Sequence, residues 1–116
     1  MAVFDVYAES CPSRQLLNLV TSRWAVLAVS ALGDGPVRFG ALRRRLEGIS
    51  AKVLADKLRQ LEEEGLVERV IVDRPLAVTY GLTEVGRSLV GPLATLCRWA
   101  ESHCDLAAVT NDRSGV

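Results

Sequence analysis

Residues 36–65 read PVRFGALRRRLEGISAKVLADKLRQLEEEG, and this stretch decides the fold. Apolar residues recur at helical spacing over residues 39–46, which predicts an amphipathic helix. Gly48, Ile49 and Ser50 then interrupt the pattern. Because Ser50 is a favoured N-cap residue, a second helix is expected over residues 51–64, where a glycine follows its end. Two helices joined by a short glycine-containing turn form a helix-turn-helix.

Two further helices are expected before this stretch. Pro12 suits the first position of a short helix that ends near Val20. Residues 24–32 are apolar almost throughout, and residues 33–36 then supply a turn rich in glycine and proline. This second segment therefore predicts a largely buried helix.

A hairpin and a final helix are expected after the central stretch. Residues 66–72 and 77–82 are rich in β-branched residues, and residues 73–76 between them resemble a hairpin turn, which predicts two antiparallel strands. Thr83 is a suitable cap for one long helix that continues to about residue 103. Pro92 predicts a kink within that helix.

The order of these elements predicts a mainly α fold with a small β-hairpin wing, a dimeric winged helix-turn-helix. One domain is expected over residues 11–104, because 116 residues leave little room for a second core. An N-terminal arm, 1–10, and a flexible polar tail, 105–116, flank it. A homodimer is expected because the final helix carries an apolar stripe longer than so small a core can cover. The stripe consists of Val85, Leu89, Leu93, Leu96 and Ala100.

Charge is segregated along the chain although the whole chain is neutral. The 14 basic and 14 acidic residues balance, which argues against coating nucleic acid through bulk positive charge. Residues 38–60 nevertheless hold seven basic and two acidic residues, a local net charge of +5. Residues 62–64 follow as an acidic run that is expected to face away from any polyanion. The predicted helix-turn-helix therefore carries a basic surface.

This basic segment indicates a surface for double-stranded DNA. The second helix of a helix-turn-helix enters the major groove, where side chains near its N-terminus reach base edges. The predicted base contacts are Ser50, Lys52, Val53, Asp56 and Lys57. Arg43, Arg44, Arg45 and Arg59 are predicted to hold phosphates, Arg38 completes the basic surface, and Arg74 at the hairpin tip is predicted to enter the minor groove. The alternative for residues 43–45 is an ordinary solvated helix face.

Other classes of function find less support in the sequence. A phosphate-binding glycine loop, a metal-ligand cluster and a nucleophile with a credible base are all missing, so neither an enzyme nor a cofactor is expected. His103 and Cys104 are adjacent, but a closed zinc site needs about four ligands. The main alternative is a winged helix that binds another protein. A cytoplasmic protein is expected, because no bilayer-spanning apolar run or secretory signal is recognised.

The sequence resembles the HxlR-type family of winged helix transcriptional regulators, relatives of the MarR-like proteins. The resemblance rests on CPSRQLLNLVTSRWAVLAVSAL at 11–32, GPVRFGALRRRLEGISAKVLADKLRQLEEEGLVER at 35–69 and YGLTEVGRSLVGPLATLCRWAESH at 80–103. It implies DNA binding as a homodimer, with the recognition helix at 50–64, the wing at 69–80 and a dimer interface from the first and last helices. Two-fold symmetry then predicts a pseudo-palindromic operator whose half-sites lie about 34 Å apart.

The chain has three cysteines, and an odd number favours reduced thiols. Cys11 precedes Pro12 at a predicted helix start, where the helix dipole and Arg14 favour a thiolate. It also matches the N-terminal cysteine that senses oxidants or electrophiles in some members of the family that the chain resembles. This match suggests redox control of DNA binding, and the alternative is a small buried hydrophobic residue. Cys97 and Cys104 are expected to serve packing.

Overall fold

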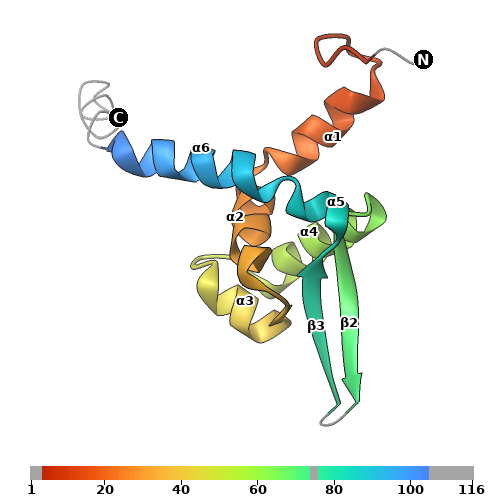
Figure 1. The fold of residues 1–116 in the computed structure, drawn as a ribbon, viewed down its shortest axis with the longest axis vertical. Helices are drawn as coiled ribbons and strands as arrows, with labels where there is room; N and C mark the ends of the chain where they lie inside the picture. Colours follow the sequence, from red (N-terminus) through yellow and green to blue (C-terminus); the bar gives the residue numbers. More distant parts are fainter. Residues whose placement is uncertain (1–3, 74–75, 105–116) are drawn as a thin grey trace.

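The computed structural model of the chain describes residues 4–73 and 76–104. The elements are α1 (Pro12–Val20), α2 (Arg23–Ala31), the 3₁₀ turn η1 (Leu32–Asp34), β1 (Val37–Arg38), α3 (Phe39–Arg45), α4 (Ala51–Glu63), β2 (Val67–Asp73), β3 (Leu76–Leu82), α5 (Glu84–Arg87) and α6 (Val90–Ser102). Helices α2, α3 and α4 form a central group (Figure 1). Helices α1 and α6 diverge from one end of this group, and the β2–β3 hairpin extends from the other.

The predicted helix-turn-helix is confirmed. The Oγ of Ser50 accepts a hydrogen bond of 3.1 Å from the N–H of Val53, which satisfies one of the free amides at the start of α4. Past the other end of α4, Gly65 has φ of 75°, a left-handed conformation that glycine adopts at little cost. Leu54 and Leu61 are fully buried on the inner face of the helix, so its opposite face is directed to solvent.

An aliphatic core holds the three central helices, the sheet and α6 together. Its buried residues are Val20, Ala25, Val26, Ala28, Val29, Leu32, Leu42, Leu46, Ile49, Leu54, Leu58, Leu61, Leu66, Val67, Leu82 and Leu93. No polar or charged side chain is buried among the residues that the structure describes. Removal of apolar surface from water, at about 25 cal/mol per Å², is therefore the main force that positions α4.

The sheet has a third strand that the sequence did not predict. β1 pairs antiparallel with β3, with Val37 opposite Tyr80 and Arg38 opposite Thr79, so the strand order is β1-β3-β2. A strand of two residues is too short to show the alternation of apolar and polar residues from which strands are predicted. The predicted hairpin itself is confirmed, with β2 and β3 in register from Val67 opposite Leu82 onward.

The prediction of one continuous final helix was wrong. Ser88 and Leu89 separate α5 from α6. The interruption lies one turn before Pro92, which has no N–H to donate to the carbonyl of residue 88. Pro92 therefore sits in the first turn of a new helix, where the missing donor costs little. The side chain of Thr83 caps α5, as predicted, and accepts a hydrogen bond of 3.0 Å from the N–H of Gly86.

Several predicted features lie wholly or partly outside the described residues. Arg74 at the hairpin tip, residues 1–3 of the expected arm and residues 105–116 of the expected tail are among them. Within the described ranges, no single helix is long and apolar enough to cross a membrane, and α1 followed by α2 and η1 passes that test only as a pair bent by 69°.

Candidate nucleic-acid interface

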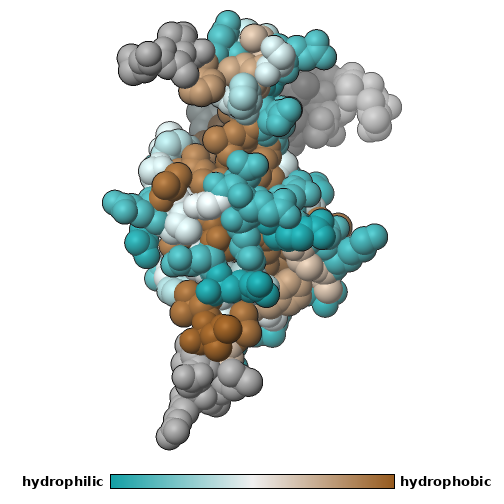
Figure 2. Space-filling view, turned by 90° about the vertical axis from the view of Figure 1, so that its right-hand side faces the viewer, coloured by the Kyte–Doolittle hydropathy of each residue, from teal (hydrophilic) through white to brown (hydrophobic). Residues whose placement is uncertain are grey.

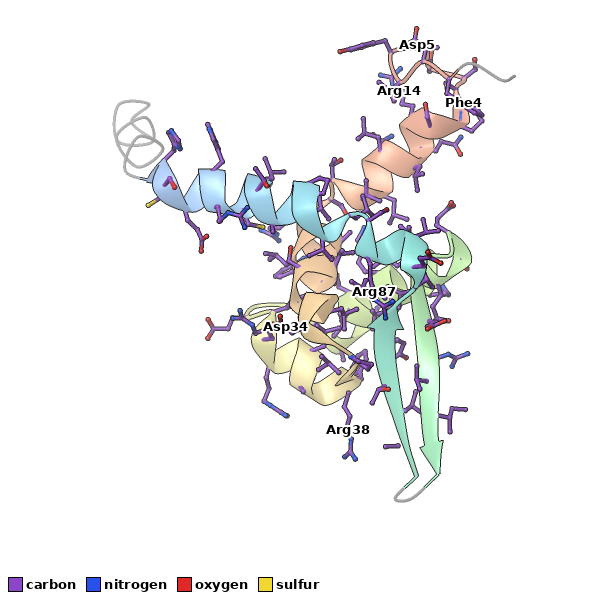
Figure 3. The ribbon with its side chains drawn as sticks, in the orientation of Figure 1. Phe4, Asp5, Arg14, Asp34, Arg38 and Arg87 are labelled. Carbon is purple, nitrogen blue, oxygen red and sulfur yellow. The ribbon has the colours of Figure 1, made fainter. Side chains whose placement is uncertain are left out.

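The arginines at the start and end of α3 form an exposed basic cluster, which consists of Arg38, Arg43, Arg44 and Arg45. All four side chains are exposed, and none forms an ion pair with a carboxylate of the described residues. Figure 3 shows Arg38 projecting towards the side on which the wing extends. The last three lie in the final turn of α3, where the helix dipole favours cations. This cluster therefore has charge available for an external anion.

The exposed face at the start of α4 carries the predicted base contacts. Lys52 is exposed, and Val53 retains 37% of its accessible surface. Ser50 is also exposed, but its oxygen already accepts the capping hydrogen bond, so its remaining hydroxyl proton is the group that a base can use. Asp56 and Lys57 follow one turn later and are partly exposed. The structure brings these five predicted residues together on the first two turns of α4.

Arg59 differs from the other predicted phosphate contacts. Its guanidinium lies 3.5 Å from the carboxylate of Asp56 and 3.9 Å from that of Glu63, within the same helix. Both pairs are largely exposed, and such pairs contribute about 0–1 kcal/mol. Arg59 is therefore held along the helix surface by weak interactions, and it also occupies the carboxylate of Asp56. Sequence reasoning did not anticipate this engagement of two candidate residues with each other.

Two contacts between different elements connect α4 to the hairpin and to α5. Arg69 on β2 lies 3.5 Å from the carboxylate of Glu62 on α4. Thr83 donates a hydrogen bond of 2.6 Å to the carbonyl of Gly65, which joins the end of α4 to the start of α5. These contacts join residues of different elements, so a local sequence pattern carries no signal for them. They connect α4 to β2 and to the start of α5.

The described part of the wing is apolar on one face. Figure 2 shows hydrophobic residues gathered just above the grey wing tip. Ile71 and Val78 are cross-strand partners there, with 66% and 43% of their surface exposed. Arg69 is the one basic residue within residues 67–73 and 76–82, and it is paired with Glu62. Within the described residues, the wing therefore offers apolar surface, whereas α3 and α4 carry basic side chains that form no ion pair.

Cys11 has a chemically distinct environment at the start of α1. Its Sγ lies 3.0 Å from the Oγ of Ser13. This hydrogen bond lowers the pKa of the Cys11 thiol, partial burial works against the effect, and backbone N–H groups of Ser13, Asp5 and Arg14 lower the pKa further. The sequence predicted a contribution from the helix dipole and the charge of Arg14, whereas the Ser13 hydroxyl is the main cause in the structure. Cys97 packs against the core, whereas Cys104 is exposed.

A helix-turn-helix with a wing and an exposed basic face defines a class of nucleic-acid-binding proteins, and comparison with known proteins identifies the family. Residues 19–108 match the HxlR-like helix-turn-helix family. The chain is 40% identical over 112 residues to the uncharacterised HTH-type transcriptional regulator YtfH of Escherichia coli strain K12, covering 95% of this chain and 89% of that protein.

Solved structures agree with this assignment. The putative transcriptional regulator ytfH from Salmonella typhimurium superposes with a TM-score of 0.85 at 40% identity, covering 95% of this chain and 99% of that chain. The redox regulator HypR in its oxidised form superposes with a TM-score of 0.72 at 33% identity, covering 79% of this chain and 96% of that chain. The chain belongs to the HxlR-like helix-turn-helix family and is a helix-turn-helix transcriptional regulator.

Proposed function

We propose that this protein binds a specific double-stranded DNA sequence as a homodimer and thereby regulates transcription in the cytoplasm. The observation that carries the proposal is the start of α4, a capped helix with one exposed face on its first two turns, which follows an arginine cluster that forms no ion pair within the described residues. A helix of this diameter fits the major groove of B-form DNA. The basic cluster of α3 then contacts phosphates on the flanking backbone.

Exposed apolar residues on the diverging helices support the homodimer. Leu16 and Leu17 on α1 are 40% and 42% exposed, and Leu96 and Trp99 on α6 are 51% and 59% exposed. An apolar groove of about 310 Å³ lies between α1 and α5. A second copy that covers these surfaces removes them from water. Two-fold symmetry then requires a pseudo-palindromic operator with half-sites about 34 Å apart.

Cys11 supports a redox response of the proposed DNA binding. Its lowered pKa increases the fraction of nucleophilic thiolate at neutral pH. A peroxide transfers one oxygen atom to the thiolate sulfur and leaves as hydroxide, which converts the thiolate to a sulfenic acid. The similar structure of an oxidised redox regulator favours this chemistry over a purely structural thiol. Cys11→Ser is expected to abolish the effect of hydrogen peroxide on DNA binding, and an unchanged response would refute the sensor role.

The decisive experiment measures DNA affinity and its dependence on salt. The protein is titrated, under reducing conditions, into a fluorescent duplex that covers the intergenic region upstream of its own gene, at two salt concentrations. Wild type is compared with Arg43→Ala/Lys52→Ala and with Arg14→Ala, which changes charge at the end of the molecule opposite to Arg38 (Figure 3). Each phosphate contact contributes a slope of about −0.9 to log K against log salt.

The proposal expects tight, salt-sensitive binding that the double variant loses and Arg14→Ala retains. Competition with random duplex should leave the specific complex in place, since specific sites bind about 10³-fold or more tightly than random sequence. A lack of preference over random duplex would contradict the proposal and favour the alternative, a winged helix that binds another protein.

A further inference from the structure

The outward face of α4 carries few of the side chains that usually read bases in the major groove. Leu54, Leu58 and Leu61 mark the inner face, so Lys52 and Asp56 project from the opposite side and Val53 from the flank next to them. Bidentate reading of guanine uses arginine or lysine, and that of adenine uses asparagine or glutamine. Residues 50–58 contain no arginine, asparagine or glutamine. Hydrogen bonding from the first two turns is therefore limited to few groups.

Two of those groups are already engaged within the protein. The Oγ of Ser50 accepts the capping hydrogen bond of 3.1 Å, and the carboxylate of Asp56 lies 3.5 Å from the guanidinium of Arg59. Lys52 and Lys57 form no ion pair within the described residues, but a flexible four-carbon side chain serves a phosphate as readily as a base. Hydrogen bonds alone therefore give this face little power to distinguish bases.

Val53 is the largest exposed apolar side chain on the first two turns of α4, where the methyl groups of Ala51 and Ala55 are also exposed. It keeps 37% of its accessible surface in the free protein, beside Lys52 and one turn before Lys57. Valine lowers helix propensity slightly, and the cap needs only its backbone N–H, so neither helix formation nor capping accounts for the side chain. In the major groove, the 5-methyl group of thymine is the apolar group that base edges present. A branched apolar side chain on this surface matches that group.

We propose that Val53 reads the 5-methyl group of thymine in each half-site of the operator. This inference rests on the proposed function, because it assumes that α4 lies in the major groove. Burial of one methyl group contributes enough to change affinity about fourfold. Two symmetric half-sites then give about fifteenfold discrimination between thymine and uracil, which lacks the methyl group.

Two random duplex pools test the proposal with the full-length protein. One pool is synthesised with thymidine and the other with deoxyuridine, and both are subjected to rounds of binding and selection. The preferred duplex from the thymidine pool is then remade with each thymine replaced by uracil. The affinities of the thymine duplex and the uracil duplex are then measured for wild type, Val53→Ala and Val53→Thr. The threonine variant retains one of the two γ-methyl groups of valine. Because Val53 is partly exposed, neither substitution leaves a cavity in the core.

The expected result is a loss of about fourfold per half-site when one particular thymine becomes uracil, with the loss abolished in Val53→Ala and intermediate in Val53→Thr. Equal affinity of wild type for the two duplexes overturns the proposal. An equal loss in wild type and Val53→Ala also overturns it, since the methyl group then acts through DNA shape. If no sequence is enriched in either pool, the protein does not bind DNA sequence-specifically. That outcome is a failure of the proposed function itself.

Discussion

The contact between Cys11 and Ser13 sets the reactivity of one thiol in this chain. The hydroxyl of Ser13, 3.0 Å from the sulfur, stabilises the thiolate and lowers the pKa of Cys11. Serine is neutral, so this effect requires only a hydrogen bond and persists at high salt, unlike a charge at the same distance. The chemical distinction of Cys11 from the exposed Cys104 therefore arises from its neighbour two residues along the chain.

Ser13→Ala is expected to raise the pKa of Cys11 towards the usual thiol value. Because a lowered pKa keeps the thiolate present as the pH falls, the alkylation rate of Cys11 by iodoacetamide should remain high at lower pH in wild type than in the variant. Mass spectrometry of the peptides that contain Cys11 and Cys104, over a range of pH, measures both thiols in one sample. Ser10→Ala is the matched control, and a similar shift in that variant would contradict the assignment to Ser13.

Gly86 has a role that its place in a short helix does not reveal. A Cβ at this position would overlap the carbonyl oxygen of Leu66 and come within 3.3 Å of the Leu82 side chain. The glycine therefore allows α5 to pack directly on the backbone at the start of β2. Gly91 in α6 has no atom within 4 Å of the corresponding position, so it provides a control for the same substitution.

Gly86→Ala is expected to lower the free energy of unfolding by about 2 kcal/mol or more, because backbone atoms must move to relieve the overlap. Gly91→Ala should leave stability unchanged or raise it by up to about 1 kcal/mol, since alanine is the better helix former. Urea denaturation followed by circular dichroism measures both. Equal effects of the two substitutions would show that the close approach at Gly86 has no energetic importance.

At the scale of single elements, α4 depends on a cap that also lies within the candidate DNA surface. Ser50→Ala removes the acceptor for the N–H of Val53 and should cost about 1 kcal/mol of stability.

Ser50→Asp keeps a good cap but places a negative charge where phosphates approach. It should therefore retain the Tm of wild type and still lose DNA affinity, and a variant that keeps both would contradict the orientation proposed for α4.

Elements that are encoded locally were predicted from the sequence, and elements that depend on distant partners were not. Ser50 and Thr83 were recognised as caps because their hydrogen bonds reach only three residues ahead. Strand β1 exists through its pairing with Tyr80 and Thr79, more than forty positions away, and two residues carry no pattern. Val85, Leu89 and Leu93 keep helical spacing across the break between α5 and α6. The apolar pattern therefore gives no indication of the break.

The candidate site was predictable only as a set of residues. Composition and spacing identified the basic residues and predicted the helix α4, because charge and amphipathic pattern are properties of the chain itself. The pairing of Arg59 with Asp56 and Glu63, and of Arg69 with Glu62, depends on rotamers and on tertiary packing. These pairings determine which charged side chains are available to DNA. The set of available charges could therefore be identified only from the three-dimensional structure.

At the scale of the whole molecule, the proposed dimer gives a prediction about α6. Leu96→Asp places a charge in a surface that is 51% exposed in one chain and covered in the proposed dimer. Sedimentation velocity should show a monomer at concentrations where wild type is dimeric, with weaker binding to the full operator. Ile71→Asp, on the 66% exposed wing, is the matched control and should remain dimeric. A dimer that persists in Leu96→Asp would place the subunit interface elsewhere.

The break at Ser88 and Leu89 has a consequence for how such proteins diverge. It separates α6, which extends away from the central helices, from α5, which is packed against the sheet that carries the wing (Figure 1). In the proposed dimer joined through α6, the angle at these two residues and the packing of Leu93 against the core together set how far apart the two copies of α4 stand. Mutations in this short segment can therefore change the operator spacing that a descendant of the proposed dimer accepts, while the face of α4 that is proposed to read bases is inherited intact.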